Sequence, residues 1–291
     1  MAEHDMPAGE WLDQHRGETV VVKFGGNAMV DDALSRAFAE DIVALQQAGL
    51  RPIVTHGGGP QISAELVARG IPSEFRGGLR VTSPDAAVVV RDVLARLGTE
   101  LAAQLRAAGG DAIALAAESP SQGGALFAGR RIGTVVNGQP VDLGWAGEAT
   151  TVDAASIAAV LDAGRIPVVS AMGIEEGTGD LLNINADSAA GSLAVAVQAD
   201  WLLLLTDVAG LYRDWPNRDS LVTTIDTVEL AGLLPSLEAG MIPKMAACLS
   251  AVEGGVGHAA IVDGRIPHTL LAEPFGTSGT TVTHPAEGTA P

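Results

Sequence analysis

The chain has 291 residues, which is enough for two domains or for one large α/β unit built of two lobes. Apolar residues make up 47% of it and charged residues only 18%, so disorder is excluded for most of the length. The 17 basic residues are outnumbered by 35 acidic ones, and the net charge of −18 argues against nucleic acid or an anionic membrane surface as a partner.

The first part of the chain alternates short β-rich runs with amphipathic helices. Apolar side chains recur at helical spacing after the first run, at Leu34, Phe38 and Ile42. Ser83 followed by Pro84 predicts a helix start, because the hydroxyl caps the helix and proline suits the first helical position. The predicted elements here are strands at 19–24 and 51–55 and helices at 31–50, 60–69 and 83–108.

The second part continues the same alternation. The run Trp201–Thr206 (WLLLLT) is apolar almost throughout, which is typical of a central parallel strand rather than an edge strand. Asn137-Gly138 is typical of a hairpin turn. The predicted elements are strands at 112–117, 125–128, 131–136, 166–170, 201–206, 258–262 and 280–282 and helices at 153–163, 185–198 and 242–253.

Strands that alternate with helices predict an α/β fold with an open, mostly parallel sheet sandwiched by helices. A polar, glycine-rich interruption at 173–180 predicts two lobes, 18–172 and 173–291. They follow an N-terminal extension, 1–17, in which a short helix is expected at 9–16.

The cysteine content and the lengths of the apolar runs indicate in which cellular compartment the protein is expected. The single cysteine, Cys248, excludes an internal disulfide and a cysteine-based zinc site, and it fits a reducing compartment. No apolar run reaches the ~18 residues of a membrane span, and the first ten residues are acidic and polar, unlike a signal peptide. We therefore expect a cytoplasmic protein.

Lysine is rare in this chain. Only Lys23 and Lys244 are lysines among the 17 basic residues, and the other basic residues are all arginine. Arginine is therefore used at every position where any cation would be sufficient. A compact ammonium group at two positions suggests a chemistry that needs it, with chance survival under a codon bias as the alternative.

Two glycine clusters follow the first two predicted strands, Gly25-Gly26 behind Lys23 and Gly57-Gly58-Gly59 behind His56. Ligands bind in the crevice at the carboxyl ends of the strands in an open α/β sheet. Glycines there let backbone N–H groups approach an anion, and the helix that follows adds favourable partial charge. One Gly-Gly pair is usually a tight turn, but two clusters at equivalent places favour a phosphate site.

Several familiar signatures are missing. The chain has no G-x-x-x-x-G-K-[ST], which excludes a P-loop, and its G-x-G pairs lack the third glycine of a dinucleotide oxidoreductase. It has no G-x-S-x-G and no H-E-x-x-H motif, and its six histidines are scattered. We therefore expect no metal held by protein side chains.

Six segments carry a resemblance. They are KFGGNAM at 23–29, HGGGP at 56–60, GLRVT at 78–82, NINAD at 183–187, LTDV at 205–208 and GMIPK at 240–244. Together they resemble the amino-acid kinase family over about residues 18–283, and six motifs in order are highly specific. The first and last segments favour the members that phosphorylate N-acetyl-L-glutamate over aspartokinase and carbamate kinase.

The resemblance implies a reaction. ATP would phosphorylate the side-chain carboxylate of N-acetyl-L-glutamate to give N-acetyl-L-glutamyl 5-phosphate, in arginine biosynthesis. Because both reactants are anionic, catalysis should be mostly positioning and electrostatic stabilisation, with Mg²⁺ neutralising the nucleotide. By the same resemblance Lys23 and Lys244 stabilise the phosphoryl group from opposite sides, and Asp187 orients both lysines. A purely structural salt bridge is the alternative for Asp187.

Nucleotide binding is assigned by the same resemblance, with the nucleotide in lobe 173–291. The residues implied to grip ATP or its phosphates are Gly25, Gly26, Gly57, Asp207, Gly210 and Leu211. For Asp207 a helix or turn cap is the alternative.

Substrate binding is implied for lobe 18–172 and its neighbouring motif. Gly58, which also donates to phosphate, and Gly59 would face the amino-acid substrate. Arg80 matches the clamp on its α-carboxylate, a task suited to a bidentate guanidinium, and Asn183 contacts the same part of the substrate. The alternatives are a surface arginine and a turn asparagine.

Regulation and specificity are less closely matched. His268 and Glu273 resemble the arginine-binding segment of feedback-inhibited members, although the stretch from Glu273 to Thr280 is about two residues shorter here. We expect a homo-oligomer, a dimer or larger, with weak arginine inhibition. The stretch 114–121 (ALAAESPS) replaces a Gly-x-x-Gly-x-Asp pattern of the family.

Two other functions remain open at this point. One is a kinase of a different acylated amino acid, which the changed stretch 114–121 allows. The other is a non-catalytic amino-acid sensor that keeps the fold, which the retained Lys23, Lys244 and Asp187 disfavour.

Overall fold

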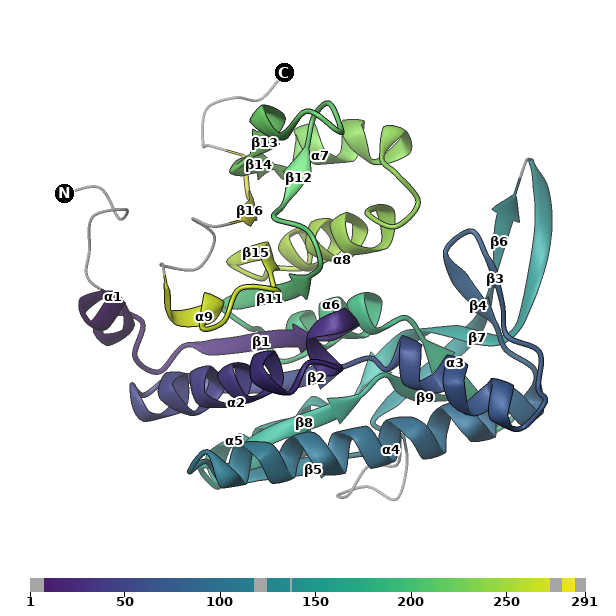
Figure 1. The fold of residues 1–291 in the computed structure, drawn as a ribbon, viewed down its shortest axis with the longest axis horizontal. Helices are drawn as coiled ribbons and strands as arrows, with labels where there is room; N and C mark the ends of the chain where they lie inside the picture. The colour runs from purple at the N-terminus through teal and green to yellow at the C-terminus, as the bar shows by residue number, and fades with distance from the viewer. Residues whose placement is uncertain (1–7, 118–124, 137, 273–278, 286–291) are drawn as a thin grey trace.

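The computed structural model describes residues 8–117, 125–136, 138–272 and 279–285 (Figure 1). Its α-helices are α1 (Ala8–Gln14), α2 (Asp32–Gln47), α3 (Gly59–Ala68), α4 (Pro84–Ala107), α5 (Ala154–Asp162), α6 (Ala186–Ala196), α7 (Thr227–Leu233), α8 (Ile242–Glu253) and α9 (Thr269–Ala272). Short 3₁₀ helices are η2 (Gly26–Met29), η3 (Arg218–Ser220) and η4 (Leu234–Ser236). Within these ranges, no helix is long and apolar enough to cross a membrane.

The strands form one large sheet and three small ones. They are β1 (Thr19–Phe24), β2 (Arg51–His56), β3 (Glu74–Arg76), β4 (Leu79–Val81), β5 (Ala112–Leu115), β6 (Phe127–Val136), β7 (Gln139–Val152), β8 (Ile166–Ser170), β9 (Met172–Glu175), β10 (Leu181–Ile184), β11 (Trp201–Thr206), β12 (Leu211–Tyr212), β13 (Leu221–Val222), β14 (Thr224–Asp226), β15 (His258–Asp263) and β16 (Gly279–Thr283).

The large sheet has eight strands in the order β14-β16-β15-β11-β1-β2-β8-β5. All neighbouring strands run parallel except β15 and β16, so the predicted open, mostly parallel α/β sheet is confirmed. β11 lies between β1 and β15 and is buried at every residue, as its apolar sequence predicts. Helices at 31–50, 83–108, 153–163, 185–198 and 242–253 are confirmed as α2, α4, α5, α6 and α8.

Alternation along β1 directs its side chains to two different cores. Val20 and Val22 pack in the cluster that contains residues of α2, whereas Val21 packs in the cluster formed with α6 and α8. Successive residues of a strand point to opposite faces, so Lys23 shares the face of Val21. The strand therefore directs the Lys23 side chain towards α6.

Two features were not expected from the sequence. β10, β7, β6 and β9 close into a small barrel, and β3 pairs with β4 in a hairpin. The predicted strands at 125–128 and 131–136 are wrong in detail, because β6 is one continuous strand that pairs with β7. Of the predicted turn, Asn137 lies outside the described residues. Both hairpins stand at the same end of the molecule, towards which β1 points (Figure 1).

Helix ends follow their sequence signals. The Ser83 hydroxyl accepts a hydrogen bond from the Ala86 N–H, and the Asp31 carboxylate accepts from Ala33 and Leu34, so both caps fix helix starts. In the N-terminal extension, Trp11 of α1 is buried in the core beside Trp201. The division into lobes stays a prediction; residue 173 itself lies within β9.

Candidate active site

Three charged residues from three different elements meet at the carboxyl end of β1. Lys23 Nζ lies 2.8 Å from Asp187 Oδ1, and Lys244 Nζ lies 2.8 Å from Asp187 Oδ2. Lys23 and Asp187 are buried, with 7% and 4% of their surfaces exposed. One carboxylate thus holds both lysines of the chain, one on each oxygen.

The charge of this group is fixed by its own geometry. Burial on its own would raise the pKa of Asp187, but the charges and hydrogen bonds of Lys23 and Lys244 outweigh it and lower the pKa from 3.8 to about 2. The carboxylate is therefore ionised at neutral pH. Two ammonium groups against one carboxylate leave a net positive site in a strongly acidic chain.

Local sequence explains why Asp187 lies where it does. The Asn185 side chain caps α6, with its Oδ1 accepting from the N–H groups of Asp187 (2.9 Å) and Ser188 (3.1 Å). The cap starts the helix at the end of β10 and places Asp187 in its first turn. Lys244 lies in the first turn of α8, beside Pro243, so two helix N-termini converge on the same point and add positive partial charge.

A cavity of about 240 Å³ lies over this group. It brings together most of the predicted site residues: Lys23, Gly25, Gly26, Gly57, Gly58, Gly59, Arg80, Asn183 and Asp187. Apolar side chains, including those of Phe75, Leu79 and Leu94, complete the wall. Lys244 is not part of the lining, but its ammonium group donates to Asp187, which is.

The glycines in this cavity are required by close approaches. Gly26 has a φ of +69°, and a Cβ there would lie 3.0 Å from both carboxylate oxygens of Asp207. A Cβ at Gly25 would lie 2.9 Å from Lys23 Nζ. The two glycines therefore let the Lys23 ammonium group and the Asp207 carboxylate lie close against the backbone after β1.

In the second glycine cluster, Gly57-Gly58-Gly59, one N–H group forms a backbone hydrogen bond and the other two belong to residues that line the cavity. The Gly57 N–H already donates to the carbonyl oxygen of Phe24 at 3.2 Å, so its role as a phosphate donor stays a prediction. Throughout the described ranges, no acceptor faces the N–H groups of Gly58 and Gly59. Gly58 and Gly59 form the N-terminus of α3 and line the cavity, so their N–H groups are available to a ligand there.

Arg80 is a buried cation held only by neutral groups. Its guanidinium donates to Ser73, to Ser63 Oγ at 3.0 Å and to the Gly59 carbonyl at 3.3 Å, and it lies over the Phe75 ring. Burial lowers the pKa of Arg80, and in the described part of the chain no carboxylate pairs with it within 4.0 Å. A 7%-exposed guanidinium without a counter-ion fits an anionic ligand. Its alternative as an ordinary surface arginine is therefore wrong.

Asn183 lines this cavity, whereas Gly210 and Leu211, two of the residues predicted to bind the nucleotide, line another one. Asn183 Nδ2 donates to Thr82 Oγ1 at 3.0 Å, which joins β10 to the chain after Arg80. Gly210 and Leu211 line a separate cavity of about 100 Å³ together with Tyr212, Trp215 and Met241. Asp207 lies close to Gly26, since a Cβ built on Gly26 would come 3.0 Å from its carboxylate oxygens, but it lines neither of the two cavities.

The predicted effector residue His268 is not among the residues that line the cavity. His268 Nδ1 lies 2.7 Å from Asp41 Oδ1 of α2, and its Nε2 lies 3.8 Å from Glu40. The hydrogen bond to Asp41 raises the pKa of His268. Glu273 and residues 118–121 of the changed stretch lie outside the described residues.

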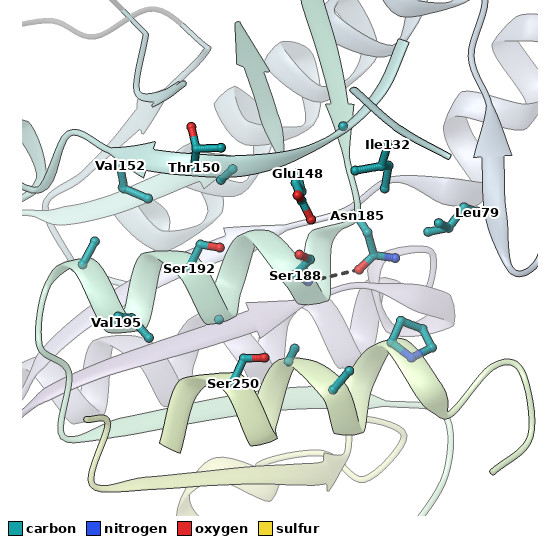
Figure 2. A pocket seen from close by; sticks show the side chains of 17 residues that line it. Leu79, Ile132, Glu148, Thr150, Val152, Asn185, Ser188, Ser192, Val195 and Ser250 are labelled. Atoms are coloured by element: carbon teal, nitrogen blue, oxygen red, sulfur yellow. Dashed lines mark hydrogen bonds between the residues drawn. The ribbon is translucent and has the colours of Figure 1, made fainter. Parts of the chain in front are cut away.

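A larger cavity of about 560 Å³ adjoins the first and shares Leu79, Ile132, Gly147 and Asn185 with it. Figure 2 shows side chains from α6 (Ser188, Ser192), α8 (Ser250) and β7 (Glu148, Thr150) around it. Its lining contains none of the charged residues that the sequence predicts for catalysis. The larger cavity therefore does not coincide with the Lys23–Asp187–Lys244 group.

The sequence did not single out the residues that support this site. Ser63 and Ser73 hold Arg80, and Thr82 holds Asn183. His56 holds the Gly57 carbonyl. His56 and Thr82 have a sequence signal, since they lie in the segments HGGGP and GLRVT. The contacts of Ser63 and Ser73 become visible only when distant segments meet.

Comparison with known proteins gives a consistent result. The model of the Amino acid kinase family matches residues 18–263. An acetylglutamate kinase of Kineococcus radiotolerans is 55% identical over 276 residues, covering 92% of this chain and 91% of that protein. An acetylglutamate kinase of Clavibacter michiganensis is 57% identical over 271 residues, covering 92% of this chain and 88% of that protein.

Solved structures agree on the fold. N-acetylglutamate synthase from Neisseria gonorrhoeae, complexed with coenzyme A and N-acetyl-glutamate, matches with a TM-score of 0.80 and 27% identity. The match covers 96% of this chain but 62% of the synthase. Carbamate kinase from Giardia lamblia bound to AMP-PNP has a TM-score of 0.67 at 17% identity, covering 92% of this chain and 99% of that one, and shows the shared fold alone.

Proposed function

The chain belongs to the amino acid kinase family, and from this premise we infer that it transfers the γ-phosphoryl group of ATP to the side-chain carboxylate of N-acetyl-L-glutamate. The product is N-acetyl-L-glutamyl 5-phosphate. The curated relatives at 50–57% identity carry the name acetylglutamate kinase, which supports a place in arginine biosynthesis. The site geometry supports each part of this reaction.

The chemistry needs charge stabilisation rather than a base. The substrate carboxylate is already ionised at neutral pH; one of its oxygens attacks the γ-phosphorus while the bond to the β–γ bridging oxygen breaks and ADP leaves. Lys23 and Lys244 are held by opposite oxygens of Asp187, so both ammonium groups are placed before the reaction begins. Charge that spreads over the phosphoryl oxygens is then met by fixed cations.

Recognition of the acyl amino acid is assigned to Arg80 and its neighbours. The buried guanidinium has neutral partners and can receive the α-carboxylate. Gly58 and Gly59 present N–H groups to the same cavity, and Asn183 is held at its wall by Thr82. The side-chain carboxylate would then point from Arg80 towards Lys23.

The nucleotide is assigned to the side of the cavity formed by Gly25, Gly26 and Asp207. A Cβ on Gly25 would meet Lys23 Nζ, and a Cβ on Gly26 would meet the Asp207 carboxylate. The bare backbone therefore lets both charged side chains lie close to the place assigned to the phosphate chain. The small cavity at Gly210 and Leu211, with the rings of Tyr212 and Trp215, fits the nucleoside. Mg²⁺ would be held by the ATP phosphates, whose charge it neutralises; among the described residues no group of three side chains could hold it.

The observation that carries the proposal is the Lys23–Asp187–Lys244 group, at 2.8 Å on each side, in one cavity with an Arg80 that has no counter-ion among the described residues. The test compares N-acetyl-L-glutamate, N-acetyl-L-aspartate and free L-glutamate in the presence of ATP and Mg²⁺. Hydroxylamine traps an acyl phosphate as a hydroxamate, which is measured beside ADP release. Hydroxamate from N-acetyl-L-glutamate alone supports the proposal; equal or greater yield from another acid assigns a different substrate.

Regulation, assembly and compartment complete the proposal. We place the enzyme in the cytoplasm as a homo-oligomer that arginine inhibits weakly through the segment of His268 and Glu273. The buried Cys248 supports a reducing compartment. Titrating arginine against wild type and Glu273→Ala tests the effector site: inhibition that Glu273→Ala leaves unchanged would place it elsewhere.

A further inference from the structure

His56 is a fully buried titratable residue that the proposed reaction does not use. It ends β2, directly before the glycine cluster, and none of its surface is exposed. Its Nδ1 lies 3.0 Å from the carbonyl oxygen of Gly57, and its Nε2 lies 3.3 Å from Ser170 Oγ. An imidazole so placed contacts the backbone of the site without reaching the cavity.

The hydrogen bonds decide which nitrogen carries the proton. A carbonyl oxygen can only accept, so Nδ1 must be the donor to Gly57. In a neutral ring Nε2 can then accept from the Ser170 hydroxyl, which also lies 3.4 Å from the Leu94 carbonyl oxygen. Burial lowers the pKa of His56, against the opposite effect of the bond to Gly57. The ring is therefore a neutral donor aimed at one carbonyl.

Fixing that carbonyl also fixes the next N–H. The Gly57 carbonyl and the Gly58 N–H belong to one planar trans peptide, so they point in opposite directions. His56 holds the carbonyl of this Gly57-Gly58 peptide, and the Phe24 carbonyl holds the N–H of the peptide before it. The Gly57-Gly58 peptide therefore has little freedom to turn. Glycine residues would otherwise allow this peptide many orientations.

Gly98 shows that room has been left for this ring. It lies in the interior of α4, where glycine is less favourable than alanine. A Cβ at Gly98 would lie 2.9 Å from His56 Nε2 and 3.3 Å from Ser170 Oγ. An α4 with alanine here would be the better helix but would push against the imidazole.

We propose that His56 is a positioning residue for phosphoryl transfer: its Nδ1–H holds the Gly57 carbonyl so that the Gly58 N–H faces the transferred phosphoryl group, and Gly98 provides the space for its ring. The inference rests on the proposed kinase activity. His56 touches neither substrate, so its effect acts through the Gly58 N–H. Loss of the alignment lowers kcat more than it raises either KM, because the contact matters most as charge develops in the transition state.

Two amide substitutions separate positioning from filling of space. The amide nitrogen of asparagine reaches about as far from the backbone as Nδ1 of histidine, whereas that of glutamine reaches about as far as Nε2. His56→Asn therefore keeps a donor for Gly57, and His56→Gln loses it. We expect kcat of His56→Gln to be about 10-fold or more below that of His56→Asn, with both KM values within about 2-fold, since a small misplacement can cost ~10²-fold.

Gly98→Ala gives a second measurement that keeps the imidazole. Its added methyl displaces the ring, so kcat should fall while thermal unfolding stays cooperative. Gly232→Ala in α7 is the matched control, because a methyl there meets nothing within 4 Å, and it should leave kcat unchanged.

The outcomes are distinguishable. Equal kcat values in His56→Asn and His56→Gln overturn the proposal. An unchanged kcat in Gly98→Ala also overturns it, and this variant alone decides the question if neither His56 variant folds. A wild-type protein that yields no hydroxamate overturns the proposed function instead.

Discussion

Replacing Asp187 by asparagine removes the charge that holds both lysines while keeping the shape of the side chain. Asp187 is 4% exposed, and each of its carboxylate oxygens lies 2.8 Å from the nitrogen of one ammonium group. In Asp187→Asn the two ammonium groups would lie beside a neutral amide. The variant therefore tests whether this carboxylate organises the site.

The structure sets the size of the effect. Lowering the Asp187 pKa from 3.8 to about 2 favours the ionised form by roughly 2 kcal/mol, at ~1.36 kcal/mol for each unit. Removing one partner of a buried ion pair costs about 3–5 kcal/mol, because the remaining charge is left unpaired. At about 2–4 °C for each kcal/mol, Tm should fall by roughly 6–20 °C.

Calorimetry and steady-state kinetics provide the assay. We expect kcat to fall by about 10²-fold or more and KM for ATP to stay level or fall, since the site becomes more positive. The matched control is Asp162→Asn, which removes a solvent-exposed partner of Arg51 at 2.7 Å and should cost under about 1 kcal/mol. Equal Tm losses in the two variants, or a near-normal kcat in Asp187→Asn, would refute the reasoning.

Three further predictions concern single residues. Arg80→Ala should raise KM for the acyl amino acid by about 10-fold or more, since a hydrogen bond to a charged group is worth ~1.5–3 kcal/mol; a selective rise in KM for ATP would place Arg80 in the wrong half of the site. Gly26→Ala should raise KM for ATP in the same assay while KM for the amino acid stays unchanged, because φ is +69° and Asp207 lies 3.0 Å from the added methyl; the reverse pattern would contradict the assignment. The pKa of His268 is raised above 6.5, chiefly by its hydrogen bond to Asp41 and further by Glu40, so its stabilisation is complete below the unfolded value and is lost as pH rises through the folded one. The Tm difference between wild type and His268→Gln should therefore be larger near pH 6 than near pH 8; a difference that ignores pH would show that the pair does not titrate.

Local signals predicted the parts of the fold that depend on local physics. The Ser83-Pro84 start and the apolar run Trp201–Thr206 each specify an element through its cap or its burial. β7, from Gln139 to Val152, was not predicted because it contains two glycines and has no regular alternation of burial. Its form depends on closing a barrel with β6, β9 and β10, and no local pattern encodes that closure.

The site residues likewise fall into those that local sequence signals predicted and those that they did not. Lysine scarcity and the glycine clusters pointed to Lys23 and its neighbours from residue type alone. The link from Asp187 to Lys244, 57 residues apart, came only through the resemblance of ordered motifs. Contacts such as His56 with Gly98 depend on how helices pack on the sheet, so they became visible only in three dimensions.

The most direct test of the two-lysine mechanism is the rate of hydroxamate formation from N-acetyl-L-glutamate by wild type, Lys23→Arg and Lys244→Arg. Arginine keeps the charge, but its planar fork cannot replace a point donor in a crowded phosphate site. Both variants should unfold cooperatively and show kcat about 10²-fold or more below wild type, the loss of ~2.7–4 kcal/mol expected for a donor to developing charge. A kcat close to wild type in both variants would contradict the mechanism.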